Sequence, residues 1–284
     1  MKSVTVFIGA LAAAAMISGG ASDAATGFDY ADFAAVLAEY VDDNGLVDYA
    51  ALKVNRERLD AFVDLLAHVD PNAYQDWSDG EKIAFWINAY NGLTLKLIVD
   101  RHPIDSSFLR SIAFPKNSIM QIPGRWTEVT FEVMSGQMTL DAIEHDVLRA
   151  QLGEPRIHMA LVCAALSCPE LRKEPFVAAR LEEQLDDQAR EFLANKNKFR
   201  IDREGNVVYL SAIFDWFTED FVDRYGSGDP QGQRSEKTQA VINFVARYVS
   251  GADAAYLASG DYRIKYLDYD WTLNEQPDST HSEH

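Results

Sequence analysis

The sequence is poor in cysteine and in basic residues, and each shortage excludes a class of protein. Two cysteines among 284 residues are too few for a small scaffold held together by disulfides. The 26 Lys+Arg against 44 Asp+Glu give a formal net charge of −18, so the phosphates of nucleic acid would be repelled over most of the surface. We therefore expect no nucleic-acid partner.

Motifs for common cofactors and metals are also missing. The chain has no phosphate-binding loop, no dinucleotide fingerprint, no H-E-x-x-H, no zinc ribbon and no G-x-S-x-G nucleophile turn. We expect no cofactor and no metal. What is present is a composition of 48% hydrophobic and 25% charged residues, which is typical of a folded soluble protein with a substantial core.

Residues 1–24 resemble a secretory signal peptide. Lys2 is followed by an apolar stretch from Val4 to Ile17 and then by small residues suited to cleavage. This stretch is shorter than the roughly 20 residues that span a bilayer, and no cysteine before Cys163 could carry an amino-terminal lipid. We predict a soluble exported protein, periplasmic or secreted, that enters no membrane once the signal is removed. Its oligomeric state stays open.

The remaining sequence predicts one α+β domain over residues 25–274, helix-rich and with a small, mainly antiparallel sheet, followed by a disordered tail over 275–284. Apolar periodicity and capping residues predict helices over residues 28–41, 55–68, 78–101, 140–152, 176–195, 211–225 and 235–249. β-prone runs predict strands over residues 126–133, 157–165, 199–201, 207–210 and 262–267, with a hairpin between 199–201 and 207–210.

Two asparagines interrupt the apolar helix predicted over 78–101. Asn88 and Asn91 lie three residues apart and therefore share a helix face, and Trp86 is close by in the sequence. A buried amide needs hydrogen-bond partners. The pair either orients a catalytic group or a substrate, with Trp86 beside it, or forms a structural network that ties the helix to neighbouring loops.

A histidine and a glutamate stand side by side in the helix predicted over 140–152. His145 lies at the edge of an apolar stripe and could act as a general base. Glu144 could orient it, although chain neighbours on an α-helix point about 100° apart and need not touch. The alternative is a partly buried histidine whose hydrogen bonds serve the fold alone.

The apolar run over residues 157–165 leads into both cysteines. In a strand, His158 and Cys163 would point to opposite faces because their separation is odd. Cys163, near the end of this strand, is either a candidate nucleophile or an inert core thiol. A Cys163–Cys168 disulfide is also open in an oxidising compartment, provided that the chain turns between the two residues.

Together these segments resemble the domain of unknown function 547 family. The motifs AFWINAYNGLTL, LDAIEHDVLR and RIHMALVCAALSCPEL carry the resemblance, which GLVDYAAL, LSAIFDWFTEDF and YLDYDWTLNE extend to residues 28–275. Bacterial members are often exported, in agreement with the predicted signal peptide. The resemblance implies that Cys163 is the functional thiol, because plant members keep it and have serine at the position of Cys168. Ala165 departs from the family pattern, which usually has serine there.

We interpret the chain first as a cysteine-dependent acyl-transfer enzyme, a peptidase, amidase or transferase. Cys163 would be the nucleophile, His145 the base, and Glu144 or Asn88 the orienting group. The order of histidine before cysteine differs from that of papain-like enzymes unless the fold is circularly permuted. The alternatives are a non-catalytic periplasmic binding module for a small molecule or peptide, and a thiol/disulfide-active protein that uses Cys163 and Cys168.

Overall fold

The computed structural model of the chain describes residues 27–226 and 234–277. The predicted signal peptide lies outside these residues, as does most of the tail predicted over 275–284. Glu275 and Gln276, at the start of that tail, are hydrogen-bonded to the folded chain. Each helix in the two described ranges is too short or too polar to cross a bilayer.

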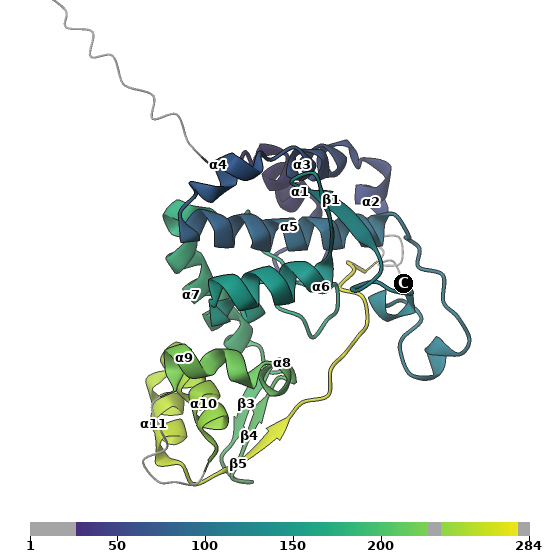
Figure 1. Cartoon of the computed structure of the whole chain (residues 1–284). Coiled ribbons are helices and arrows are strands. Elements are labelled where there is room, and N and C mark those ends of the chain that lie inside the picture. Colours follow the sequence, from purple (N-terminus) through teal and green to yellow (C-terminus); the bar gives the residue numbers. More distant parts are fainter. Residues whose placement is uncertain (1–26, 227–233, 278–284) are drawn as a thin grey trace, which may run out of the picture.

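The first half of the chain folds around one long buried helix, α5 (Asp79–Val99). A capping box fixes its start, as predicted: the Ser78 hydroxyl accepts from the Glu81 backbone, and the Glu81 carboxylate accepts from the Ser78 backbone. The helix is apolar almost all round because other elements cover it on several sides (Figure 1). The helices before it are α1 (Ala31–Tyr40), α2 (Tyr49–Val54), α3 (Glu57–Ala67) and α4 (Pro71–Gln75).

An irregular stretch and a β-hairpin connect α5 to the next helix. The stretch contains two short 3-10 turns, and the hairpin confirms only the second half of the strand predicted over 126–133. Thr139 caps a helix that begins with α-type turns and continues with wider π-type turns. These elements are η1 (Arg110–Ile112), η2 (Ile119–Gln121), β1 (Thr130–Val133), β2 (Gly136–Thr139), α6 (Leu140–Ala142) and η3 (Ile143–Leu152).

The prediction of a strand over residues 157–165 is wrong. A 3-10 helix, η4 (Pro155–Met159), occupies the first part of this run. Pro155 suits the first turn of a helix, and the Glu154 side chain caps that turn by accepting a backbone N–H. The local start signal therefore outweighs the β-prone composition of the residues that follow.

The rest of the run is an irregular buried segment. The Val162 N–H donates to the amide oxygen of Asn91 (2.9 Å) instead of to a neighbouring strand, and Ala165 forms only an isolated bridge. The run is apolar because it is covered by other elements, not because it belongs to a sheet. His158 and Cys163 are consequently not related by strand alternation.

The second half of the chain packs helices on a three-stranded sheet. Its central strand, β4 (Val207–Leu210), pairs with β3 (Phe199–Asp202) in antiparallel and with β5 (Arg263–Tyr266) in parallel orientation. With the β1–β2 hairpin, this gives the helix-rich α+β fold with small, mainly antiparallel sheets that the sequence predicted. The further helices are η5 (Ala178–Arg180), α7 (Leu181–Ala194), α10 (Glu236–Tyr248) and α11 (Gly251–Ser259).

The single helix predicted over 211–225 is broken. Its residues form α8 (Ile213–Trp216), η6 (Thr218–Phe221) and α9 (Val222–Tyr225). The break falls at Phe217, whose backbone leaves the helical region (φ −119°, ψ 22°). The second half of the chain has its own hydrophobic core, the second core, in which Phe214 and Phe221 pack with Phe192 and Phe244. Because of the break, Phe214 and Phe221 enter this core while Trp216 and Phe217 face a cavity.

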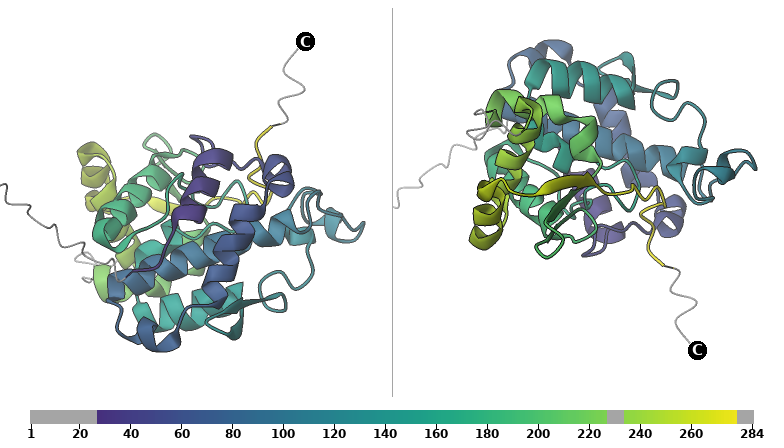
Figure 2. Two further views of the ribbon diagram at one scale, coloured as in Figure 1. Left: turned by 90° about the horizontal axis from the view of Figure 1, so that it is seen from above. Right: turned by 90° about the horizontal axis from the view of Figure 1, so that it is seen from below.

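The last described segment returns from β5 to the helices of the first half, as the yellow trace in Figures 1 and 2 shows. The Leu166 N–H donates to the Thr272 carbonyl (2.8 Å), which pairs this return with the segment that contains both cysteines. Further on, the buried Asn274 accepts a hydrogen bond from the Tyr49 hydroxyl (2.8 Å). The return therefore brings the C-terminal aromatic residues next to the cysteines.

Candidate functional site

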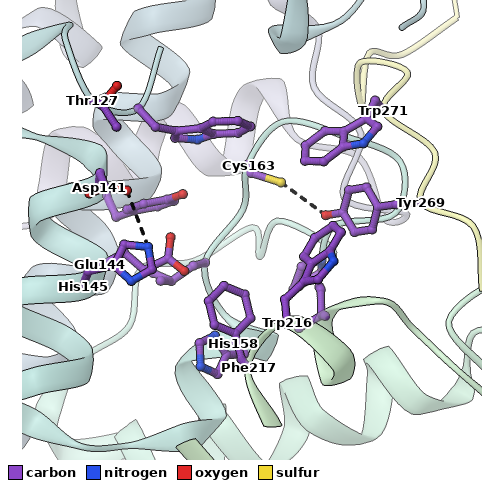
Figure 3. Close-up of a pocket in the computed structure, with 15 residues that line it drawn as sticks. Thr127, Asp141, Glu144, His145, His158, Cys163, Trp216, Phe217, Tyr269 and Trp271 are labelled. Atoms are coloured by element: carbon purple, nitrogen blue, oxygen red, sulfur yellow. Dashed lines mark hydrogen bonds and ion pairs between the residues drawn. The ribbon is translucent and has the colours of Figure 1, made fainter. Parts of the chain in front are cut away.

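A cavity of about 260 Å³ lies where the η3 helix, the cysteine segment, α8 and the C-terminal return meet (Figure 3). Its walls are mainly aromatic and include Tyr90, Trp126, Trp216, Phe217, Tyr269 and Trp271. Its polar lining includes Asp141, Glu144, His145, His158 and Cys163. An apolar hollow with few polar groups is typical of a small-ligand site. Four residues singled out in the sequence, Glu144, His145, His158 and Cys163, thus line one cavity.

One wall of the cavity carries two carboxylates and an imidazole. Asp141, Glu144 and His145 come from α6 and η3, where residues three and four apart share a helix face. His145 Nε2 lies 3.5 Å from Asp141 Oδ1. In the part of the chain that the structure describes, no Lys or Arg forms an ion pair with Asp141 or Glu144. The wall therefore presents negative charge to the cavity.

Arg149 fixes the tautomer of His145. Its guanidinium, which has no acceptor, donates to His145 Nδ1. The Nδ1 atom is therefore without a proton, and the proton of the neutral ring is on Nε2, on the side of Asp141. In this arrangement the Nε2–H of His145 is directed towards Asp141, at the cavity wall.

A buried network behind this wall holds His158. Asp220 accepts two hydrogen bonds from Arg149 (2.6 and 2.8 Å) and one from His158 Nε2 (2.7 Å). Burial alone would raise the pKa of Asp220, but these donors outweigh it and hold the pKa well below its usual range. His158 also stacks on Phe217, with ring centroids 4.1 Å apart. The network fixes the position of His158 at the floor of the cavity.

The two cysteines form a disulfide with their Cα atoms 6.1 Å apart. The turn that this requires is present: Ala164 adopts a left-handed conformation (φ 58°), and the Cys168 N–H donates to the Ala165 carbonyl (3.0 Å). Cys163 is half-buried at the cavity wall, whereas Cys168 is buried. A nucleophilic thiolate at Cys163 therefore requires that the disulfide first be reduced.

The hydroxyl of Tyr269 lies close to both sulfur atoms, and the Cys163 backbone N–H donates to Cys168 Sγ (3.0 Å). The hydroxyl lies 3.3 Å from Cys163 Sγ and 3.2 Å from Cys168 Sγ. Burial, together with the charge of Glu144, raises the pKa of this hydroxyl well above its usual value. Tyr269 is therefore a neutral hydrogen-bond donor. Figure 3 shows the Cys163 sulfur directed towards Tyr269 and His145 on a different wall, and no hydrogen bond joins Cys163 to His145 among the described residues.

The predicted amide pair lies outside the cavity. Asn88 exchanges two hydrogen bonds with the Phe176 backbone (2.7 and 2.9 Å), and Asn91 bonds the segment just before Cys163 in the same way, at 3.0 and 2.9 Å. Trp86 is also elsewhere, with its indole N–H donating to the Tyr74 hydroxyl (2.8 Å). The amides therefore form a structural network: Asn91 ties α5 to the cysteine segment, and Asn88 ties it to the loop at Phe176.

Sequence reasoning missed most of the cavity wall. Asp141 was detectable, because it precedes Glu144 and His145 by three and four residues on the predicted helix. Trp216 and Trp271 belong to two of the family-like motifs, but only the C-terminal return brings the two side chains together in the cavity wall. The described ranges contain no group of three or more His, Cys, Asp or Glu side chains that could hold a metal ion.

Comparison with known proteins shows that a family model covers part of this site. Residues 74–193 match the family described as "Protein of unknown function, DUF547". The matched range includes Glu144, His145 and both cysteines, and it ends before Trp216 and Trp271, which complete the cavity. No curated protein and no solved structure matches the chain.

Proposed function

Residues 74–193 belong to the domain of unknown function 547 family, and from the cavity we propose that the chain binds a small-molecule or peptide ligand and acts on it through Cys163. The reaction is a cysteine-dependent acyl transfer of the peptidase, amidase or transferase type. One observation carries this proposal: Cys163, Glu144 and His145, selected from the sequence alone, line the same aromatic cavity.

The active form has a reduced Cys163. Two thiols of an external reductant supply two electrons and two protons, which converts the disulfide into two cysteine thiols and the reductant into its own disulfide. The Cys163 thiolate then adds to the acyl carbon, and the leaving group departs with a proton. Water or an amine subsequently releases the acyl group. The Tyr269 hydroxyl, 3.3 Å from the sulfur, donates to the thiolate.

The proton acceptor is a group of the acidic wall. Glu144 is our candidate, because its carboxylate lines the cavity and forms no direct ion pair among the described residues. His145 acts in the first place as a donor to the ligand, since Arg149 occupies its Nδ1. It takes the role of base if ligand binding displaces Arg149. Asn91, which fixes the backbone before Cys163, is a positioning residue.

The disulfide also favours two alternatives. It blocks the thiol, so in the oxidised protein the cavity performs no acyl transfer and can act as a binding module. The same bond, at a cavity wall, suits exchange with an external thiol, the third function considered. Disulfides persist in oxidising compartments, which supports our proposal that the protein is exported to the periplasm or secreted. The mass of the mature protein, isolated from its natural host, tests the cleavage of residues 1–24.

Acylation of the protein by p-nitrophenyl acetate tests the proposed reaction, with the adduct located by mass spectrometry. We expect wild type to gain an acetyl group at Cys163 after reduction and none before it. Cys168→Ser should be acylated without reductant, because Cys163 is then always free. Cys163→Ser, its matched control, should gain no acetyl group at residue 163 in either condition. Equal modification of all three proteins, or of none after reduction, would contradict the enzyme proposal.

A further inference from the structure

The aromatic wall of the cavity is a cluster of ring faces. Trp216, Tyr269 and Trp271 contact one another, with centroid distances of 4.8 Å (Trp216–Tyr269), 4.5 Å (Tyr269–Trp271) and 6.1 Å (Trp216–Trp271). Trp271 is also 5.8 Å from Trp126. Figure 3 shows Trp216, Tyr269 and Trp271 opposite Asp141, Glu144 and His145. Ring faces carry negative potential and attract cations, tryptophan most strongly.

The charge of the cavity has the same sign as its ring faces. Asp141 and Glu144 contribute carboxylates, and no lysine or arginine belongs to the lining. Arg149 interacts electrostatically with Glu144, but its guanidinium is hydrogen-bonded to Asp220 and to His145 Nδ1 and does not belong to the lining. Among the described residues, no lysine or arginine forms a direct ion pair with Glu144, so a cationic ligand in the cavity would supply that contact.

A cation of this site must also be partly apolar and small. A metal ion or a bare ammonium would leave the indole surfaces without contact, whereas alkyl groups around a positive nitrogen would cover them. The volume of about 260 Å³ is small for a ligand pocket, so the group held inside the cavity is small. A neutral sugar would also stack on tryptophan, but it would leave the charge of Glu144 uncompensated.

From this combination we infer that the cavity takes a compound with an alkylated ammonium group, held between the tryptophan and tyrosine faces and the carboxylates of Asp141 and Glu144. The inference rests on the proposed function, because it names the class of ligand for the same cavity. Cys163 at the adjoining wall is then placed to react with an acyl group that the ammonium compound carries.

Choline and 3,3-dimethylbutan-1-ol, its neutral isostere, are suitable probes. Both are titrated into the oxidised, full-length protein at constant ionic strength, with binding followed by calorimetry and by tryptophan fluorescence. We expect choline to bind at least about tenfold more tightly than the neutral alcohol, since shape is shared and only the charge differs.

Two variants test the walls separately. Glu144→Gln removes the charge of this carboxylate. It should lower the affinity for choline at least about fivefold and leave the affinity for the neutral alcohol unchanged. Asp146→Asn is the matched control, because this exposed carboxylate lies on the same helix and outside the cavity; it should bind choline like wild type. Trp216→Leu removes one aromatic ring at a partly exposed position and should also lower the affinity for choline.

The outcomes separate the ligand class from the proposed reaction. Preference for choline that is lost in Glu144→Gln and kept in Asp146→Asn supports the inference. Equal binding of both probes, no binding of either, or equal losses in the two carboxylate variants would overturn it. Acylation of Cys163 is measured on the same preparations after reduction and without choline, so that a failure of the ligand class is distinguished from a failure of the acyl-transfer proposal.

Discussion

Replacing Asp220 by asparagine removes the charge on which the polar floor of the cavity depends. Its side chain is 19% exposed and that of Arg149 is 25% exposed, so the pair is largely withdrawn from water. Asparagine keeps the shape but leaves the guanidinium without a carboxylate. Breaking a buried ion pair in this way costs roughly 3–5 kcal/mol, and the partial exposure favours a loss of about 3 kcal/mol in the free energy of unfolding.

The pH dependence of this loss follows from the pKa of Asp220. Burial opposes ionisation, but Arg149 and His158 lower the pKa well below that of an unfolded aspartate. A carboxyl group with a depressed folded pKa stabilises the protein above its unfolded pKa of about 3.9 and loses this effect as pH falls towards the folded value. The difference between wild type and Asp220→Asn should therefore be constant at neutral and mildly acidic pH and shrink below about pH 4.

Urea unfolding followed by tryptophan fluorescence measures both effects. Asp223→Asn is the matched control, because Asp223 is three residues further on, exposed, and without a charge partner in the described part of the chain. We expect Asp223→Asn to change stability by less than about 0.5 kcal/mol. An equal loss in both variants at neutral pH, or a gap that grows on acidification, would refute the role of Asp220 assigned here.

Two further substitutions test the packing around the site. Gly92→Ala on α5 places a methyl group against the ring of Phe62, so we expect a loss of about 1–3 kcal/mol and a lower Tm by calorimetry; an unchanged Tm would contradict this close packing. Arg156→Met leaves Glu154 and Asp186 without their buried partner and should cost roughly 3–5 kcal/mol in urea unfolding. A loss no greater than that of substituting an exposed arginine would show that the ion pairs of Arg156 with Glu154 and Asp186 do not contribute to stability.

The elements that the sequence predicted well are those with local signals. The capping box of Ser78 and Glu81 and the long apolar periodicity after it identify α5 because both depend on residues within a few turns. The turn before β4 is similar, since Asn206 tolerates the left-handed conformation (φ 54°) that the tight connection needs. The helix-rich α+β class follows from such local patterns.

The failures arise where distant contacts decide the backbone. The run over 157–165 has the composition of a strand, but Asn91 on α5 takes the hydrogen bond of Val162 that a sheet would have taken. The break at Phe217 is likewise invisible in a sequence of helix-compatible residues. It exists because the neighbouring aromatic side chains serve two sites, the second core and the cavity.

The candidate site was predictable only in part. Glu144, His145 and Cys163 could be selected because ionisable or nucleophilic residues in apolar surroundings are unusual. Their actual arrangement could not be predicted, because Arg149 bonds His145 Nδ1 and the C-terminal return brings Tyr269 to the sulfur atoms. These contacts join residues that are far apart in the chain or depend on side-chain geometry.

The reactivity of Cys163 tests our central claim most directly. In Cys168→Ser this residue is the only thiol, and its labelling by iodoacetamide can be compared in the folded protein and in urea. If the cavity is a site of thiol chemistry, the folded protein should be labelled at least as fast as the unfolded chain. Labelling that is negligible in the folded protein and rapid only after unfolding would identify Cys163 as an inert core thiol and contradict the proposal.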